Sequence, residues 1–159
     1  MTQTRRVELL SVALPEISQS INKASDSLTS NIVDLEEALG RFRLGVSVEI
    51  VLNREEVESE DQDLTFVESL AYDKHKGRWG LWLVEYYEES IDSNDPNSYT
   101  MKPLKDAPRE LRFQAVEKFP ELLQLLAQKG REFAAEAARK SESVARIASM
   151  LKSIDLLNI

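Results

Sequence analysis

The chain has no cysteine and a single histidine, His75, among its 159 residues. Without a thiol it can form no disulfide framework, no thiolate nucleophile and no cysteine-ligated zinc or iron–sulfur site. One imidazole per chain also excludes any site that needs two from the same chain. We therefore expect no cofactor and no metal centre, and a fold that rests on an apolar core, which a chain of this length can build.

Long apolar runs are lacking as well. The longest unbroken aliphatic or aromatic run is Leu81-Trp82-Leu83-Val84, whereas crossing a bilayer takes roughly 20 residues. The short apolar stretch near the N-terminus is interrupted by Glu8 and ends at Pro15, which is not typical of a secretion signal. With no cysteine to oxidise, these features predict a cytoplasmic protein that does not enter a membrane.

Motifs of the common enzyme classes are missing. The sequence contains no glycine-rich phosphate loop, no G-x-S-x-G and no H-E-x-x-H. His75 lies between two lysines in a predicted tight turn, where a general base would lack a pocket and an orienting partner. We therefore expect no catalytic residue, although a pair of carboxylates that acts on glycosides stays open.

Negative charge dominates the middle of the chain. The net charge is −8, and residues 54–100 hold 13 acidic and 4 basic side chains, while residues 101–159 hold 8 and 11. This balance argues against general binding to nucleic acid or to an anionic membrane. Residues 54–63 contain six acids without the ligand spacing or glycine of a calcium loop. They predict a solvated loop, with cation binding left open.

The N-terminal residues 1–42 have a helical period. Apolar or small residues recur at steps of three and four from Val7 to Phe42, with one extra residue between Leu28 and Ile32. So narrow a stripe is typical of a helix that packs on one or two partner helices. Pro15 either starts a second helix or kinks a continuous one, and the unbroken phase favours the kink.

The C-terminal residues 105–159 predict a short helix that starts at Asp106-Ala107-Pro108 and a long one that starts at Pro120. A helix of about 35 residues is about 50 Å long, so part of it must project or lie along a partner. We expect the long helices to pair with each other, with a second copy, or both. The seam residues that would carry this contact are Leu14, Ile17, Ile21, Leu28, Ile32, Leu35, Phe133, Val144 and Leu151.

Between the helices the period changes to two. Alternation predicts strands over 44–52, 64–72 and 79–86, with a hairpin turn at 75–78 and a short edge strand at 99–104. The fold class is therefore α+β: a long N-terminal helix, a three- to four-stranded antiparallel β-meander, then short and long C-terminal helices with coiled-coil-like packing. We expect a single domain over 1–159, with helical arms 1–42 and 105–159 around a meander at 43–104.

Four aromatic residues of the third strand form a possible docking face for another protein: Trp79, Trp82, Tyr86 and Tyr87. Trp and Tyr are common anchors of protein interfaces, whereas the neighbouring Glu85, Glu88 and Glu89 would repel phosphate. The competing interpretation is that these rings belong to the core.

One cluster of basic residues follows the meander: Lys102, Lys105, Arg109 and Arg112, with Lys118 beyond. The hypothesis that the sequence favours is a non-catalytic adaptor that forms a homo-oligomer through its long helices. An inhibitor or immunity-type protein, whose acidic meander binds a basic partner such as a nuclease, is the first alternative. A nucleic-acid-associated factor that uses the basic face at 102–118 is the second.

Overall fold

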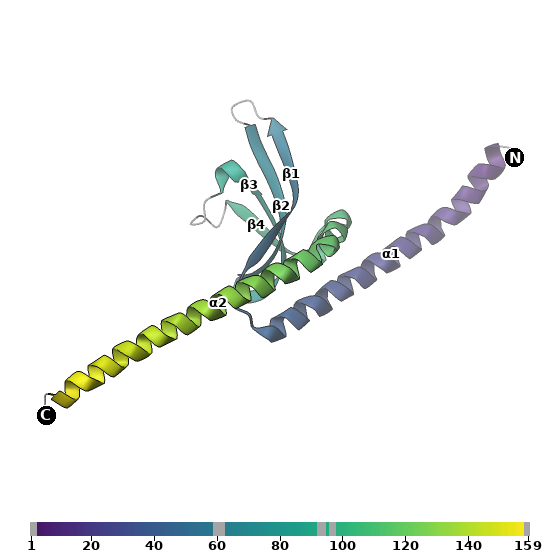
Figure 1. Ribbon diagram of the computed structural model, residues 1–159. Helices are drawn as coiled ribbons and strands as arrows, with labels where there is room; N and C mark the ends of the chain where they lie inside the picture. Colours follow the sequence, from purple (N-terminus) through teal and green to yellow (C-terminus); the bar gives the residue numbers. More distant parts are fainter. Residues whose placement is uncertain (1–2, 59–62, 92–94, 96–97, 158–159) are drawn as a thin grey trace.

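A computed structural model describes the backbone of residues 3–58, 63–91, 95 and 98–157, and the side chains of 13–58, 64–91, 95 and 98–153. Two long helices pack on the same face of one sheet (Figure 1). The elements in chain order are α1 (Gln3–Phe42), β1 (Val48–Glu58), β2 (Asp63–His75), β3 (Arg78–Tyr87), η1 (Glu88–Ser90), β4 (Tyr99–Pro103), η2 (Leu104–Asp106) and α2 (Arg109–Leu157). The strands pair antiparallel in the order β1-β2-β3-β4. The predicted α+β class and its meander are confirmed, with four strands.

Helix α1 is continuous over 40 residues and holds Pro15 in its interior, as the unbroken phase of its apolar residues indicated. It ends at Phe42, where the chain turns through two positive φ angles, 49° at Arg43 and 66° at Gly45. Glycine enters this left-handed region without a steric penalty. The chain thus leaves the helix and enters β1 within a few residues.

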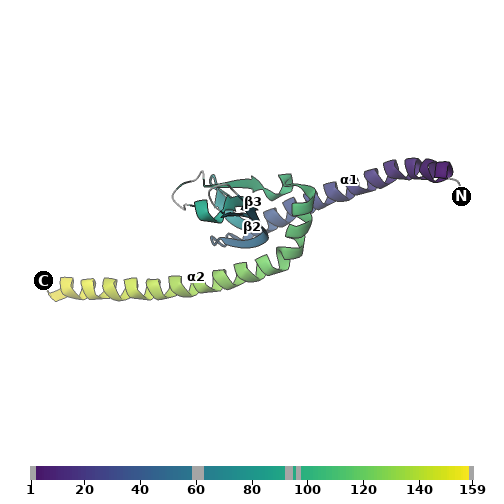
Figure 2. The same cartoon turned by 90° about the horizontal axis from the view of Figure 1, so that it is seen from above.

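Helix α2 is also continuous, over 49 residues, with Pro120 inside it. The predicted short and long helices are the two segments of this one helix, which bends. Figure 2 shows that the first turns of α2 run at a steep angle to the remainder. A proline inside a helix has no N–H to donate and pushes away the carbonyl four residues earlier, which bends the helix without ending it.

The two helices leave the sheet in opposite directions (Figures 1 and 2). They meet where Arg112 donates hydrogen bonds to the hydroxyls of Ser25, at 2.8 Å, and Thr29, and where Arg109 donates to Asn22 at 3.1 Å. Beyond this crossing the described parts of α1 and α2 diverge. The expected pairing of the two long helices along their length does not form within one chain.

The main core lies on the face of the sheet that the helices cover. Strand residues such as Leu70, Tyr72 and Leu83 pack there with Ile32 of α1 and Leu122 of α2. Glu36 fastens α1 to the sheet, because its carboxylate accepts the Leu81 backbone N–H at 2.9 Å and lies 3.8 Å from Arg78. Strand β4 pairs with β3 only from Trp82 onward, so Glu36 satisfies a donor that would otherwise lie on an open strand edge.

The predicted acidic loop at 54–63 is wrong for most of its length. Strand β1 continues to Glu58 and pairs with β2 as far as Glu58 opposite Asp63, while residues 59–62 lie outside the described residues. Backbone pairing continues through this stretch, for example between Glu55 and Phe66 and between Val57 and Leu64. The acidic side chains do not prevent it, because they remain in water. The other hairpin turn is as predicted, with φ of 48° at Lys76 and 82° at Gly77.

Candidate interaction surfaces

The predicted seam on α1 lies partly against the sheet and partly in solvent. Ile32 is 1% exposed, and Leu28 and Leu35 pack against the core beside it. Farther from the sheet, three predicted seam residues are exposed: Leu14, Ile17 and Ile21. Val7 and Leu10, which continue the same spacing, lie outside the described side chains. The structure therefore separates the seam into a core part and an uncovered part.

Both parts belong to one face of α1. At 100° per residue, Ile21, Leu28, Ile32 and Leu39 fall within about 40° of one another around the helix axis. Of these, Ile32 and Leu39 are buried and Leu28 is half-buried, whereas Ile21 is exposed. The stripe is exposed at Ile21 because the helix extends past the sheet, while the pattern of the stripe is unchanged.

Helix α2 repeats this arrangement at the other end of the molecule. Leu122 and Leu126 are buried in the core, while Phe133, Val144 and Leu151 are exposed farther along the same helix, Val144 to 65%. These five residues also lie within about 40° of one another around the axis. Two more exposed apolar residues, Ile147 and Met150, widen the stripe beyond the predicted seam.

The polar faces of the projecting part of α2 carry ion pairs along the helix. Lys140 lies 2.6 Å from Glu136 and Arg146 lies 3.9 Å from Glu142, each four residues apart. The hydrogen bond from Lys140, followed by its positive charge, lowers the pKa of Glu136. Pairs of this kind stabilise a solvated helix by a few tenths of a kcal/mol each. The polar faces of α2 are therefore stable in water, whereas exposure of the apolar stripe to water is unfavourable.

Strand alternation divides the four residues of the predicted docking face. Trp79 packs on the helix-covered face, where it stacks on Tyr72 with ring centroids 5.6 Å apart. Tyr87 pairs with Phe66 at 5.3 Å near the end of β3. Trp82 and Tyr86 lie on the opposite face of the sheet, in a small cluster of their own. The structure thus brings together only Trp82 and Tyr86 of the four.

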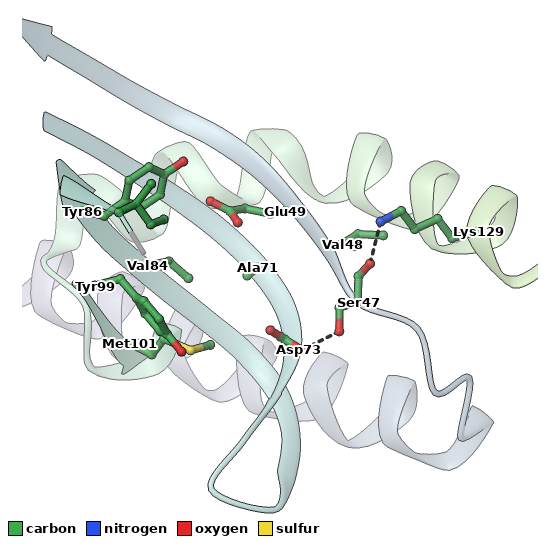
Figure 3. A pocket seen from close by; sticks show the side chains of 11 residues that line it. Ser47, Val48, Glu49, Ala71, Asp73, Val84, Tyr86, Tyr99, Met101 and Lys129 are labelled. Carbon is green, nitrogen blue, oxygen red and sulfur yellow. Dashed lines mark hydrogen bonds between the residues drawn. The ribbon is translucent and has the colours of Figure 1, made fainter. Parts of the chain in front are cut away.

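This second face of the sheet, which the helices do not cover, contains a hollow of about 370 Å³. Its floor is apolar, from Ala71 and Val84, and Tyr86 and Tyr99 stand on one side of it (Figure 3). The carboxylates of Glu49 and Asp73 lie on the other side. The hollow therefore joins aromatic walls to negative charge.

The negative charge beside the hollow affects the pKa of the Tyr86 phenol. Burial is the main cause that raises its pKa, and the negative charge of Glu49 raises it further, while the nearby Ser69 hydroxyl acts in the opposite direction. Ser69 is fully buried, and its Oγ has no hydrogen-bond partner of ordinary geometry.

The basic cluster is engaged within the chain at most of its positions. Lys102 pairs with Glu85 at 2.8 Å and Lys118 with Glu121 at 2.9 Å, while Arg109 and Arg112 bond to α1. Lys105 is exposed on η2. Four of these five side chains thus have partners within the chain.

His75 lies edge-on against Trp82, with ring centroids 5.0 Å apart, and the Arg78 guanidinium lies 5.3 Å from the same ring. The histidine thus sits in a packing contact at the hairpin. Over the described part of the chain, no group of three or more His, Asp or Glu side chains is placed to hold a metal ion. The described helices include none that is long and apolar enough to span a membrane.

Comparison with known proteins finds no relative. No protein-family model matches the chain. No curated protein matches its sequence, and no solved structure matches its fold.

Sequence reasoning missed the hollow, although part of its signal was present. Glu49 interrupts the apolar run of β1, and alternation places it on the face away from Val48 and Ile50. Asp73 and Tyr99 belong to other strands, and only the register of the sheet brings them onto the same face. That register depends on the length of each turn, which residue types alone do not give.

Proposed function

We propose that this protein is a non-catalytic cytoplasmic adaptor that self-associates through its two projecting helices. The α1 arm is residues 3–21, before the contact with the start of α2, and the α2 arm is residues 130–157, after Lys129. The observation that carries the proposal is that each core stripe continues, in phase, beyond the sheet and into solvent. The cytoplasmic location rests on the absence of cysteine.

A helix that projects alone into water gains little stability from its backbone. Most helical stability in proteins comes from packing of the apolar face on other elements. Each arm presents large apolar side chains at the spacing of a helical seam, including Ile17 and Ile21 on α1 and Val144 and Leu151 on α2. Covering this surface would contribute about 25 cal/mol per Å² removed from water, so both arms favour an assembled state.

A second copy of the chain is the occupant that fits both arms at once. The arms leave opposite ends of the body (Figures 1 and 2), and are about 28 and 42 Å long at 1.5 Å per residue. A two-fold rotation places the α1 arm of each copy antiparallel to the α2 arm of its partner. Such a reciprocal contact closes on itself and covers all four stripes in a dimer.

The test is absolute mass by light scattering coupled to size exclusion, at several protein concentrations. We expect the natural sequence to give twice 18.1 kDa and Ile21→Asp to give the mass of one chain. Gln19→Asp is the matched control, because it adds the same charge to the opposite side of α1 and should keep the dimer. A single-chain mass for the natural sequence, or a dimer that survives Ile21→Asp, overturns the proposal.

A second candidate function is supported by the acidic hairpin of β1 and β2. The two strands pair with each other beyond Phe66, where β3 pairing ends. Glu56 and Glu58 are exposed on this projecting part, and Glu55, opposite Phe66, is exposed at its base. A protein with a basic active site, such as a nuclease, is the partner that this charge would suit. A heterocomplex that weakens steeply with salt and with Glu55→Lys, but not with Ile21→Asp, would support it.

A further inference from the structure

The hollow on the uncovered face of the sheet has the size of a ligand site. Its volume of about 370 Å³ lies in the range of small-molecule pockets. Figure 3 shows Tyr86, Tyr99 and Met101 on one side and Glu49 and Asp73 on the other. Between them lies an apolar floor, so a ligand could be flat and apolar at its centre and charged at one edge.

The charge at that edge is negative and only partly compensated by the protein. The Asp73 carboxylate accepts hydrogen bonds from the Ser47 hydroxyl and from the Lys74 backbone N–H at 2.6 Å. Lys129, the cation at the rim, donates to the Ser47 carbonyl oxygen at 3.1 Å, and lies outside ion-pair distance of Glu49 and Asp73. Glu49 is exposed at the mouth of the hollow, where its carboxylate also interacts with the Tyr86 hydroxyl.

We propose that this hollow binds a guanidinium group. A guanidinium is planar and positively charged, it stacks on aromatic faces, and its edge matches the geometry of a carboxylate. Tyr86 and Tyr99 would supply the faces, and Glu49 would accept the N–H donors, with the free lone pairs of Asp73 beside it. The site is independent of the helical arms and goes beyond the proposed self-association.

Other ligand classes fit the hollow less well. Calcium takes six to eight oxygen ligands, and the hollow offers two carboxylates beside apolar and aromatic walls. An anion would be repelled by Glu49 and Asp73. A primary ammonium would satisfy the charge, but it is compact and strongly hydrated and gains less from the flat rings.

The test is titration of the ¹⁵N-labelled protein with three probes, followed by amide shifts of Glu49, Ala71 and Tyr86. The probes are Nα-acetyl-arginine methylamide, free L-arginine, and the citrulline analogue of the first, which is neutral and has nearly the same shape. We expect saturable binding of the arginine derivative at this face and at least about tenfold weaker binding of the citrulline analogue. Equal binding of the two, or no saturable shift with arginine, overturns the proposal.

Two charge-removing variants test whether Glu49 is the carboxylate that binds the guanidinium. Glu49→Gln should weaken binding of the arginine derivative about tenfold, whereas Glu55→Gln, an equal loss of charge on the projecting hairpin, should leave it unchanged. Equal weakening by both variants would mean general attraction to an acidic surface and contradicts a site. The site should repel the carboxylate of free arginine. Stronger binding of the peptide-like derivative than of free arginine therefore assigns the guanidinium to a protein partner. Stronger binding of free arginine assigns it to a free metabolite. Amide spectra of each variant report that the fold is intact.

Discussion

Ile32 and Ile21 lie on the same face of α1, but their burial differs. Ile32 is buried against the sheet, while Ile21, three turns nearer the N-terminus, is exposed. Leu122 and Val144 make the same contrast on α2. The comparison teaches that spacing decides which face of a helix is apolar, whereas the length of the neighbouring sheet decides how much of that face the chain itself covers.

The largest effect is expected in the buried part of the stripe. Leu122 is fully buried and its neighbour Leu123 is 42% exposed. Leu122→Ala should therefore lower the free energy of unfolding by about 2–5 kcal/mol, and Leu123→Ala by about 0.5 kcal/mol or less. Urea unfolding in an Ile21→Asp background measures both without a contribution from assembly. Equal losses at the two positions would contradict the described burial.

The exposed part of the stripe should affect assembly and leave the fold of one chain intact. Val144→Asp is expected to give a monomer with unchanged helix content, because the side chain touches no core residue. Ser149→Asp, on the opposite side of α2, should remain a dimer. Mass and circular dichroism together check this. A dimer that Ile21→Asp disrupts and Val144→Asp does not would show that the α1 arms pair with each other.

Gly80 in the sheet and Gly130 in the projecting part of α2 have different surroundings. A Cβ at Gly80 would lie 2.9 Å from the Glu36 carboxylate oxygen that accepts the Leu81 N–H, whereas a Cβ at Gly130 meets nothing within 4 Å. In the same monomeric background, Gly80→Ala should cost about 1 kcal/mol through the disturbed hydrogen bond. Gly130→Ala should stabilise α2 by about 1 kcal/mol. If both variants raise the midpoint of thermal unfolding, or both lower it, the described surroundings of one of the two glycines are wrong.

The smallest effect concerns pH. The backbone N–H of Thr65 donates to Glu89 at 2.9 Å, and this bond is the main cause that lowers the pKa of Glu89 in the folded state. A lowered folded-state pKa contributes stability above the unfolded pKa, and this contribution is lost as pH falls through the folded value. Glu89→Gln should therefore make stability slightly less sensitive to acid. An unchanged acid limb in thermal unfolding would contradict this.

The meander and both helices could be predicted from the sequence because each depends on local periodicity. The turn at 75–78 has glycine where φ is positive, and Pro15 keeps the phase of α1 on both sides. The directions of the helices could not be predicted, because they depend on the bend at Pro120 and on contacts such as Arg112 with Ser25. The same holds for the hollow, which needs three strands in register, and for the acidic hairpin, whose charge masked its strand pairing.

The most direct test of reciprocal arm pairing is to mix two monomeric variants. In a dimer of Ile21→Asp with Val144→Asp, both substitutions fall in one of the two seams, and the other seam is fully natural. An equimolar mixture should therefore recover a mass of twice 18.1 kDa, while a chain that carries both substitutions should stay monomeric. A mixture that remains at the mass of one chain would contradict the pairing of the α1 arm with the α2 arm.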